Sequence, residues 1–264
     1  MRIILSPAKK MRVDDDLAPV GTPVYLPWAI QLLNYLKSLS YEELQKLWAC
    51  SDKIAQENYD RLQNMKLDDA RTPAILSYDG IAFQYMAPAV FETSQFRYVQ
   101  EHLRILSGFY GVLKPMDAVT PYRLEMQAKA QVAGTKNLYE FWGDRIYNEV
   151  ADDSHVFVNL ASKEYSKCVE KYLQPEDKMI TCVFGQIEKW RVVQKGVYAK
   201  MARGDMVRYR AENSIEDPEQ MKSYDRMGYT FREDLSSPQE YILVGGVPAK
   251  KIRDLENDLE ERDE

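Results

Sequence analysis

Basic and hydroxyl side chains follow predicted strands and open predicted helices, positions from which they could bind an anion. In α/β sheets the carboxyl ends of strands border the ligand crevice, and helix N-termini there attract negative charge. The residues in such positions are Ser6, Lys9, Lys53, Ser162 and Lys163. Each one alone is typical of a helix cap or an exposed lysine, but their recurrence predicts a site for phosphate or another anion.

Arg123 and Glu125 lie two residues apart, so in an extended strand both side chains project from the same face. They are predicted either to form a structural ion pair or to face a cleft. In a cleft the arginine would hold a phosphate group, and the carboxylate would act as a base or orient the arginine. An enzyme acting on a nucleotide or another phosphorylated small molecule could use these two together with Asp144, Ser162 and Tyr165.

A basic segment at residues 189–210 carries seven Lys or Arg side chains and one acid. Lys200 and Arg203 are three residues apart in the helix expected there, so they share a face, and Arg208 follows them. A helix face of basic side chains with tyrosines nearby suits contacts to a nucleic-acid backbone. A solvated surface helix, with its charges paired elsewhere, is the alternative.

The segment LRILSGFYGVLKPMD, at residues 103–117, predicts a helix followed by a glycine hairpin. A helix-hairpin-helix module of this kind presents backbone N–H groups to a DNA phosphate without reading sequence. The residues that would make these contacts are Ser107, Gly108, Tyr110, Gly111 and Lys114. Two residues separate the glycines where that motif has one, and Pro115 would shorten the second helix. A turn that only packs helices together is therefore the alternative.

The composition limits the classes of protein to which the chain can belong. The 35 basic and 41 acidic residues give a net charge of −6, which alone argues against a nucleic-acid binder. The tail at residues 254–264 holds seven acids and one arginine, however, so the rest of the chain is neutral overall. Three scattered cysteines and two histidines predict neither a disulfide framework nor a metal site, and no cofactor is expected. No apolar run reaches membrane-spanning length and no signal peptide is evident, so a cytoplasmic protein is expected.

The predicted elements first alternate between strand and helix and then pair locally, which indicates a mixed α/β (α+β) fold. One domain is expected over residues 1–250, followed by an acidic tail at 251–264. Strands are predicted at residues 2–6, 74–78, 155–160, 179–184, 190–193, 228–231 and 241–244. Helices are predicted at residues 28–39, 93–106, 140–150, 162–172 and 197–210, and after the caps Ser40 and Ser51. Gly204, inside the last helix, indicates a helix break or the close approach of another group.

Several blocks of sequence, in this order, resemble the YaaA family of bacterial peroxide-stress resistance proteins. These are SPAKKM (6–11), SDKIAQEN (51–58), LRILSGFYGVLKPMD (103–117), PYRLEM (121–126), LYEFWGD (138–144), NLASKEY (159–165), YAKMARGDM (198–206) and RMGYTF (226–231). The resemblance covers residues 1 to about 235. It implies a single mixed α/β domain, the cantaloupe-like fold, with a central, positively charged cleft. By position, the family's helix-hairpin-helix element would be residues 103–117.

The resemblance also implies a function. By this resemblance, the chain is expected to be a cytosolic protein that is made during hydrogen peroxide stress. It is expected to limit free intracellular iron and to bind double-stranded or branched DNA. A DNA-binding stress protein is therefore the first hypothesis, and an enzyme acting on a phosphorylated small molecule in the same cleft is the alternative. Direct iron sequestration by Asp and Glu side chains is a third. The DNA-binding hypothesis and the enzyme hypothesis both require cations from separate segments to meet in one groove. Those cations are Lys9, Lys53, Arg123, Lys163, Lys200 and Arg203.

Overall fold

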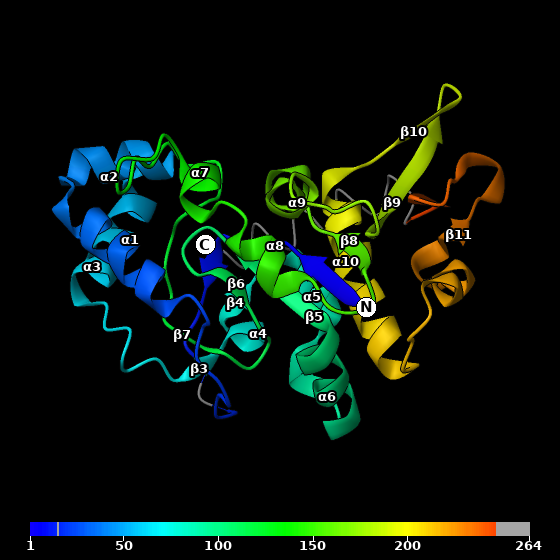
Figure 1. Ribbon diagram of the computed structural model, residues 1–264, viewed down its shortest axis with the longest axis horizontal. Coiled ribbons are helices and arrows are strands. Elements are labelled where there is room, and N and C mark those ends of the chain that lie inside the picture. Colours follow the sequence, from blue (N-terminus) through cyan, green and yellow to red (C-terminus); the bar gives the residue numbers. More distant parts are fainter. Residues whose placement is uncertain (15, 247–264) are drawn as a thin grey trace.

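A run of apolar residues near the start of the chain forms β1 (Arg2–Leu5) in the middle of an eight-stranded sheet. Its three apolar residues are at most 1% exposed, as expected of a parallel strand covered on both faces. β1 pairs in parallel with β5 (Leu103–Ser107) on one side and with β8 (Val156–Leu160) on the other. The computed structural model, shown in Figure 1, describes residues 1–14 and 16–246.

The strand order of this sheet is β11-β12-β9-β8-β1-β5-β6, and β10 pairs with the carboxyl-terminal end of β9. Its other strands are β6 (Gly111–Leu113), β9 (Lys178–Glu188), β10 (Arg191–Val193), β11 (Thr230–Phe231) and β12 (Glu240–Val244). Because β12, β9, β8, β1 and β5 are all parallel, their carboxyl ends lie at one edge, called here the carboxyl edge. Two short pairs complete the strands: β2 (Lys10–Met11) with β4 (Tyr78–Asp79), and β3 (Thr72–Pro73) with β7 (Ala118–Val119).

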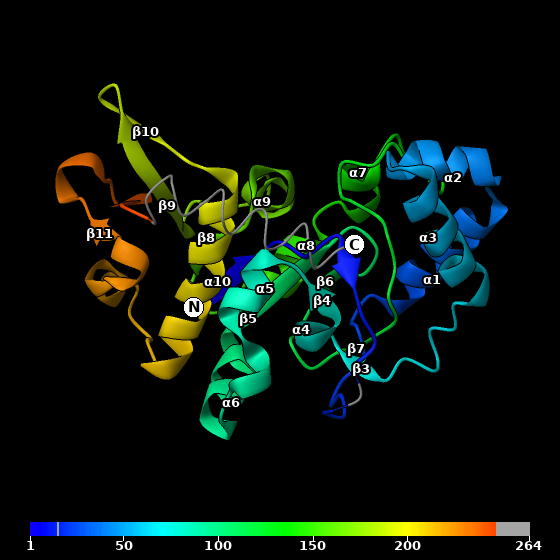
Figure 2. The same cartoon turned by 180° about the vertical axis from the view of Figure 1, so that it is seen from behind.

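Helices cover both faces of the sheet, with α8 on one face and α5 and α10 on the other (Figures 1 and 2). A group of helices, α1 to α3, lies at one end of the molecule, and the β9–β10 hairpin lies at the opposite end. The α-helices are α1 (Leu26–Ser38), α2 (Tyr41–Trp48), α3 (Asp52–Asn64), α4 (Ala74–Ser77), α5 (Ile81–Met86), α6 (Thr93–His102), α7 (Leu138–Trp142), α8 (Arg145–Val150), α9 (Lys163–Glu170) and α10 (Gly196–Glu212). In the part of the chain that the structure describes, no helix is long and apolar enough to cross a membrane.

Gly204 lets the basic helix α10 lie directly on α5. A Cβ atom at this position would stand 1.8 Å from the carbonyl oxygen of Ala82, a distance that no packing allows. The close approach predicted from the sequence is therefore confirmed, and the helix continues through Gly204 without a break. This contact fixes the distance of α10 from the first turn of α5.

The mixed α/β single domain expected from the sequence is confirmed, with three local corrections. The helix predicted at 140–150 is interrupted at Gly143 and Asp144, which separate α7 from α8. Residues 74–77 form the short helix α4 instead of a strand. The helix predicted at 93–106 ends at His102, and the chain continues as β5. All five β5 residues are buried, including Arg104 and Ser107, so Leu103 and Leu106 belong to a covered strand and not to one face of a helix. The acidic tail at 251–264 lies outside the described residues.

Candidate functional site

A pocket of about 630 Å³ opens at the carboxyl edge, beside the ends of β1 and β8. We call it the carboxyl-edge pocket. Among the residues that line it are eight of the candidates chosen from the sequence: Ser6, Lys9, Arg123, Glu125, Ser162, Tyr165, Lys200 and Arg203. These residues come from four separate segments, which follow β1, precede α7, open α9 and lie on α10. The rule that strand ends border a crevice thus led to residues that share one pocket.

The Ser6 and Ser162 side chains join the ends of two neighbouring strands. The Ser6 hydroxyl accepts a hydrogen bond from the Ser162 N–H at 2.8 Å and donates to the Ser162 hydroxyl at 3.2 Å. Ser162 is the N-cap residue of α9, but its side chain makes no capping bond to the helix. The two serines therefore fix the floor of the pocket instead of the helix end.

Glu125 holds two cations on one wall of the pocket. Its carboxylate lies 3.1 Å from the Lys9 ammonium and 3.5 Å from the Arg123 guanidinium. The ion pair and the cleft-facing arrangement predicted as alternatives therefore occur together. The Arg123 side chain is only 11% exposed, and its Nε is buried with no hydrogen-bond partner among the described residues. Arg123 is thus held in place by Glu125 with donor capacity left over.

The α10 wall carries positive charge that the described part of the protein does not neutralise. Lys200 and Arg203 lie one turn apart on α10, and both line the pocket. Within residues 1–14 and 16–246, neither forms an ion pair or a hydrogen bond, and the Nε of Arg203 is fully buried. Burial lowers the pKa of the Arg203 guanidinium. A buried guanidinium without a counter-charge is energetically costly, so this wall is suited to an anion.

Three further charged residues line the pocket: Asp79, which follows a strand predicted from the sequence, and Lys10 and Glu164, which were not expected. Lys10 and Asp79 face each other across the β2–β4 pair at 3.5 Å. Glu164, in the first turn of α9, accepts a hydrogen bond from the Gln127 N–H at 3.2 Å. Burial, together with the nearby Glu125 carboxylate, raises the pKa of Glu164. Its place two residues after Ser162 could have identified it, since first-turn side chains lie at the same edge as the cap.

Tyr165 contributes a buried phenol to the lining. Burial raises its pKa far above the ordinary value, so the hydroxyl stays protonated at neutral pH and does not act as a base. Beside it, Tyr122 and Phe83 also line the pocket. The pocket therefore combines charged walls with an aromatic portion, as small-molecule sites commonly do.

The family model described as peroxide stress protein YaaA matches residues 1–235, a range that includes every residue lining the pocket. The chain belongs to the YaaA family. A UPF0246 protein of Agathobacter rectalis is 62% identical over 244 residues, which cover 92% of this chain and 98% of the relative. A UPF0246 protein of Desulfitobacterium hafniense is 53% identical over 251 residues, or 95% and 100% of the two chains. The resemblance noted from the sequence blocks is thereby confirmed.

The helix-hairpin-helix-like element implied by the YaaA resemblance is absent from residues 103–117, which the structure describes in full. This segment forms the antiparallel strands β5 and β6 inside the sheet. Ser107, Gly108, Tyr110 and Gly111 are all buried, so their backbone groups are not exposed to a DNA phosphate. Gly111 has a φ of +76° and its hydrogen faces the Trp142 ring, which leaves no room for a side chain. The glycines serve a tight turn and close packing.

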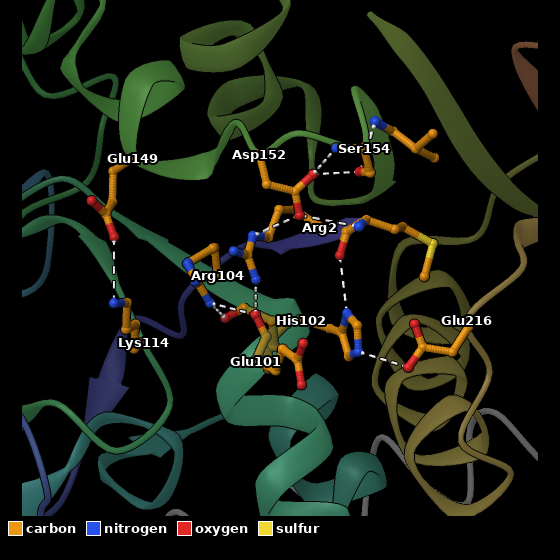
Figure 3. Close-up of polar contacts among 12 residues, drawn as sticks. Arg2, Glu101, His102, Arg104, Lys114, Glu149, Asp152, Ser154 and Glu216 are labelled. Carbon is orange, nitrogen blue, oxygen red and sulfur yellow. Dashed lines mark hydrogen bonds and ion pairs between the residues drawn. The ribbon is translucent and has the colours of Figure 1, made fainter.

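The remaining candidates lie outside the carboxyl-edge pocket, most of them with partners of their own. Lys163 pairs with Glu170, Arg208 pairs with Glu212 at 2.7 Å, and Lys114 approaches Glu149 at 3.8 Å, as Figure 3 shows for the last pair. Lys53 lies on α3 among the helices at the end of the molecule, and Asp144 is exposed before α8. Sequence position alone did not show that these side chains point elsewhere.

The described residues include two buried cysteines but no metal-binding cluster. In residues 1–14 and 16–246, no group of three or more His, Cys, Asp or Glu side chains is placed to hold a metal ion. Cys168 and Cys182 are buried free thiols, and burial raises the pKa of each to about 12. Both thiols are therefore protonated at neutral pH.

Proposed function

We propose that the carboxyl-edge pocket binds a small phosphorylated molecule. The observation that carries this proposal is the Arg203 side chain, which lines the pocket with a buried Nε and no partner in the described chain. A guanidinium forms paired, charge-assisted hydrogen bonds with phosphate oxygens, so a bound phosphate would offset the cost of burying it.

Two further features support a small ligand. Lys200 stands one turn from Arg203 on the same wall, so both cations can reach one phosphate group. A volume of about 630 Å³ lies within the range of small-molecule sites and holds a nucleotide-sized compound. Duplex DNA, by contrast, would present its phosphates over a broad surface.

The pocket also holds groups for acid–base chemistry on the bound molecule, which supports the enzyme hypothesis. Glu164 has a raised pKa, which brings a carboxyl group closer to neutrality and makes it a better general base or acid. Arg123, fixed by Glu125 and with donor capacity left over, would donate hydrogen bonds to the bound molecule and so help to position it. Chromatographic detection of a changed product after incubation with the purified chain would establish turnover.

We expect phosphorylated ligands to raise the melting temperature of the wild-type chain. A ligand at about 100 times its Kd stabilises a protein by about 2.7 kcal/mol, which corresponds to a shift of several degrees. Arg203→Gln should abolish the shift because it removes the unpaired guanidinium. Arg208→Gln, on the same helix but outside the pocket, is the matched control and should keep it.

The assay uses differential scanning fluorimetry with inorganic phosphate, ribose 5-phosphate and nucleoside monophosphates. The proposal fails if none of these shifts the wild type. It fails equally if Arg203→Gln responds as the wild type does.

Nucleic acid is a second candidate partner, and a specific feature favours it. The β9–β10 hairpin continues past the carboxyl edge, and at its turn Trp190 is 98% exposed between Lys189 and Arg191. An exposed aromatic ring flanked by cations is suited to stacking on a base while contacting phosphates. Lys189 and Trp190 both have positive φ, a conformation that non-glycine residues rarely adopt, so the turn holds the ring outward at some cost in strain.

If the hairpin binds DNA, replacing Lys189 and Arg191 with alanine will weaken binding to all sequences alike. It will also reduce the salt dependence of the affinity, because each lost phosphate contact lowers the slope by about 0.9. The matched control is the double variant Lys46→Ala/Lys53→Ala, which removes two exposed lysines at the far end of the molecule. Fluorescence anisotropy at several salt concentrations measures both quantities. Equal affinities and slopes for the two double variants would exclude the hairpin as the binding surface.

The effect on free intracellular iron implied by the family resemblance stays a prediction. Anaerobic dialysis of the purified chain against ferrous iron tests the direct form of it. Retention of iron would favour sequestration by Asp and Glu side chains, and failure to retain iron would remove that hypothesis.

A further inference from the structure

Glu164 is a carboxylate that forms no salt bridge among the described residues, in a pocket that contains unpaired cations. Lys9 acts on it electrostatically but is paired with Glu125. In the described residues, Glu125 and Asp79 pair with lysines of the same pocket, whereas Glu164 forms no ion pair. Backbone N–H groups of Gln127 and Met126 act on its carboxylate, and the Gln127 N–H donates to one oxygen at 3.2 Å. An ionised carboxylate can accept about four hydrogen bonds, so Glu164 retains acceptor capacity.

The unpaired charges of opposite sign lie apart within this pocket. Lys200 and Arg203 are on α10, Glu164 is on α9, and they do not form a salt bridge with one another. A ligand that carried only negative charge would satisfy α10 but would face repulsion from Glu164, whereas Glu125 is already paired with Lys9 and Arg123. The charge pattern therefore requires a ligand with two different ends.

We propose that the ligand carries an amino or ammonium group at the end opposite its phosphate, and that Glu164 accepts a hydrogen bond from this group. The inference rests on the proposed function, because it assumes that the α10 cations hold the phosphate. It adds the chemical class: an amine-bearing phosphorylated compound, either a nucleotide with an exocyclic amine on its base or a phosphorylated aliphatic amine.

The aromatic portion of the lining favours a nucleotide among these compounds. Phe83, Tyr122 and Tyr165 line the same pocket as Glu164, and Tyr165 follows it directly in α9. Aromatic side chains pack well against a planar base. A carboxylate beside such a surface accepts from the exocyclic amine of an aminopurine or aminopyrimidine, as Glu and Asp do with cytosine in nucleic-acid recognition.

Two matched pairs of phosphorylated compounds test the inference by isothermal titration calorimetry on the full chain. Adenosine monophosphate carries the amine where inosine monophosphate carries a carbonyl, and phosphoethanolamine carries an ammonium where 2-hydroxyethyl phosphate carries a hydroxyl. We expect the wild type to bind the amine-bearing member of at least one pair about tenfold more tightly, since the carbonyl repels the Glu164 carboxylate and a neutral hydroxyl donates a weaker hydrogen bond than an ammonium. The pair that shows the preference identifies the source of the amine.

Glu164→Ala should reduce this preference to less than about threefold while leaving phosphate binding in place. Glu164→Gln, which can still accept from the Gln127 N–H, provides a second variant that keeps the local structure. It should remove the preference for an aliphatic ammonium and weaken that for a base amine. Glu170→Gln, on the same helix but outside the pocket, is the control and should bind as the wild type does.

Phosphate-dependent binding with no preference within either pair would overturn this inference and leave the proposed function standing. A preference that survives both Glu164 variants would also overturn it. If no phosphorylated compound binds at all, the proposed function fails as well, so the two failures are distinct.

Discussion

Arginine side chains from one short basic segment have three different roles, set by neighbours that are distant in sequence. Arg203 lines the carboxyl-edge pocket, whereas Arg208 pairs with Glu212 on the same helix. Arg210 is fully buried and donates to the Tyr98 hydroxyl at 3.2 Å and to the Ile215 carbonyl at 3.1 Å. The sequence predicted a basic helix correctly but not which cations would reach a ligand. That depends on partners that only the fold brings close.

The Asp117 carboxyl group leads us to expect that the stability of the protein depends on pH. It is buried, and this burial raises its pKa to about 6, although its carboxylate accepts the Lys114 N–H at 2.8 Å. The folded state therefore binds a proton more tightly than the unfolded state, whose pKa is about 3.9. The resulting stabilisation is fully present below about pH 4 and is lost as the pH rises through about 6.

Asp117→Asn should remove this contribution, because the amide keeps a hydrogen-bond acceptor but does not titrate. Between about pH 4.5 and about pH 7.5, we expect the free energy of unfolding of the wild type to fall by about 2 kcal/mol more than that of the variant. Urea denaturation across this range measures the difference. Asp153→Asn, at an exposed position, should follow the wild type. Parallel profiles for wild type and Asp117→Asn would contradict the assignment.

At the scale of elements, the contact between α10 and α5 predicts that one methyl group added at Gly204 will strongly destabilise the protein. Gly204→Ala would place a Cβ on the Ala82 carbonyl oxygen, so the two helices must separate. Overpacking against backbone costs about 3 kcal/mol or more, since the backbone cannot rotate away as a side chain does. We also expect weaker ligand binding, because the same helix carries Lys200 and Arg203.

Gly196→Ala is the matched control, since a Cβ at the first residue of α10 meets nothing within 4 Å. This change should leave stability unaltered or raise it by up to about 1 kcal/mol, because alanine restricts the unfolded chain. Urea midpoints of the two variants measure the contrast. Equal midpoints would mean that the helices do not approach as closely as described.

Element boundaries were predictable where local chemistry decides them. Ser40 caps α2 as predicted, in a capping box with Glu43, and the strands predicted at 179–184 and 190–193 occur as β9 and β10, which pair with each other. The β5 strand was not predictable in the same way, because Leu103 and Leu106 have helical spacing as well as high apolarity. Its position between β1 and β6 decides its conformation, and that position depends on the whole sheet.

At the scale of the molecule, the position of the carboxyl-edge pocket was predictable from the sequence, but the full set of residues that line it was not. The rule that ligands bind at carboxyl ends of strands led to Ser6, Lys9 and Ser162, which do line one pocket. The same reasoning included Lys53, which the fold carries to the other end of the molecule on α3. A sequence gives the order of elements along the chain, whereas a pocket depends on their order across the sheet.

The central position of β1 has a consequence for how the chain is made. Its neighbours in the sheet are residues 103–105 and 157–160, so β1 leaves the ribosome long before either partner exists. β1 therefore has no partner in the sheet until residue 105 has been translated, and its second partner is complete only at residue 160 of 264. Non-local pairing of this kind slows folding and exposes unpaired strands. The nascent chain therefore carries an unpaired apolar strand through the first part of its synthesis.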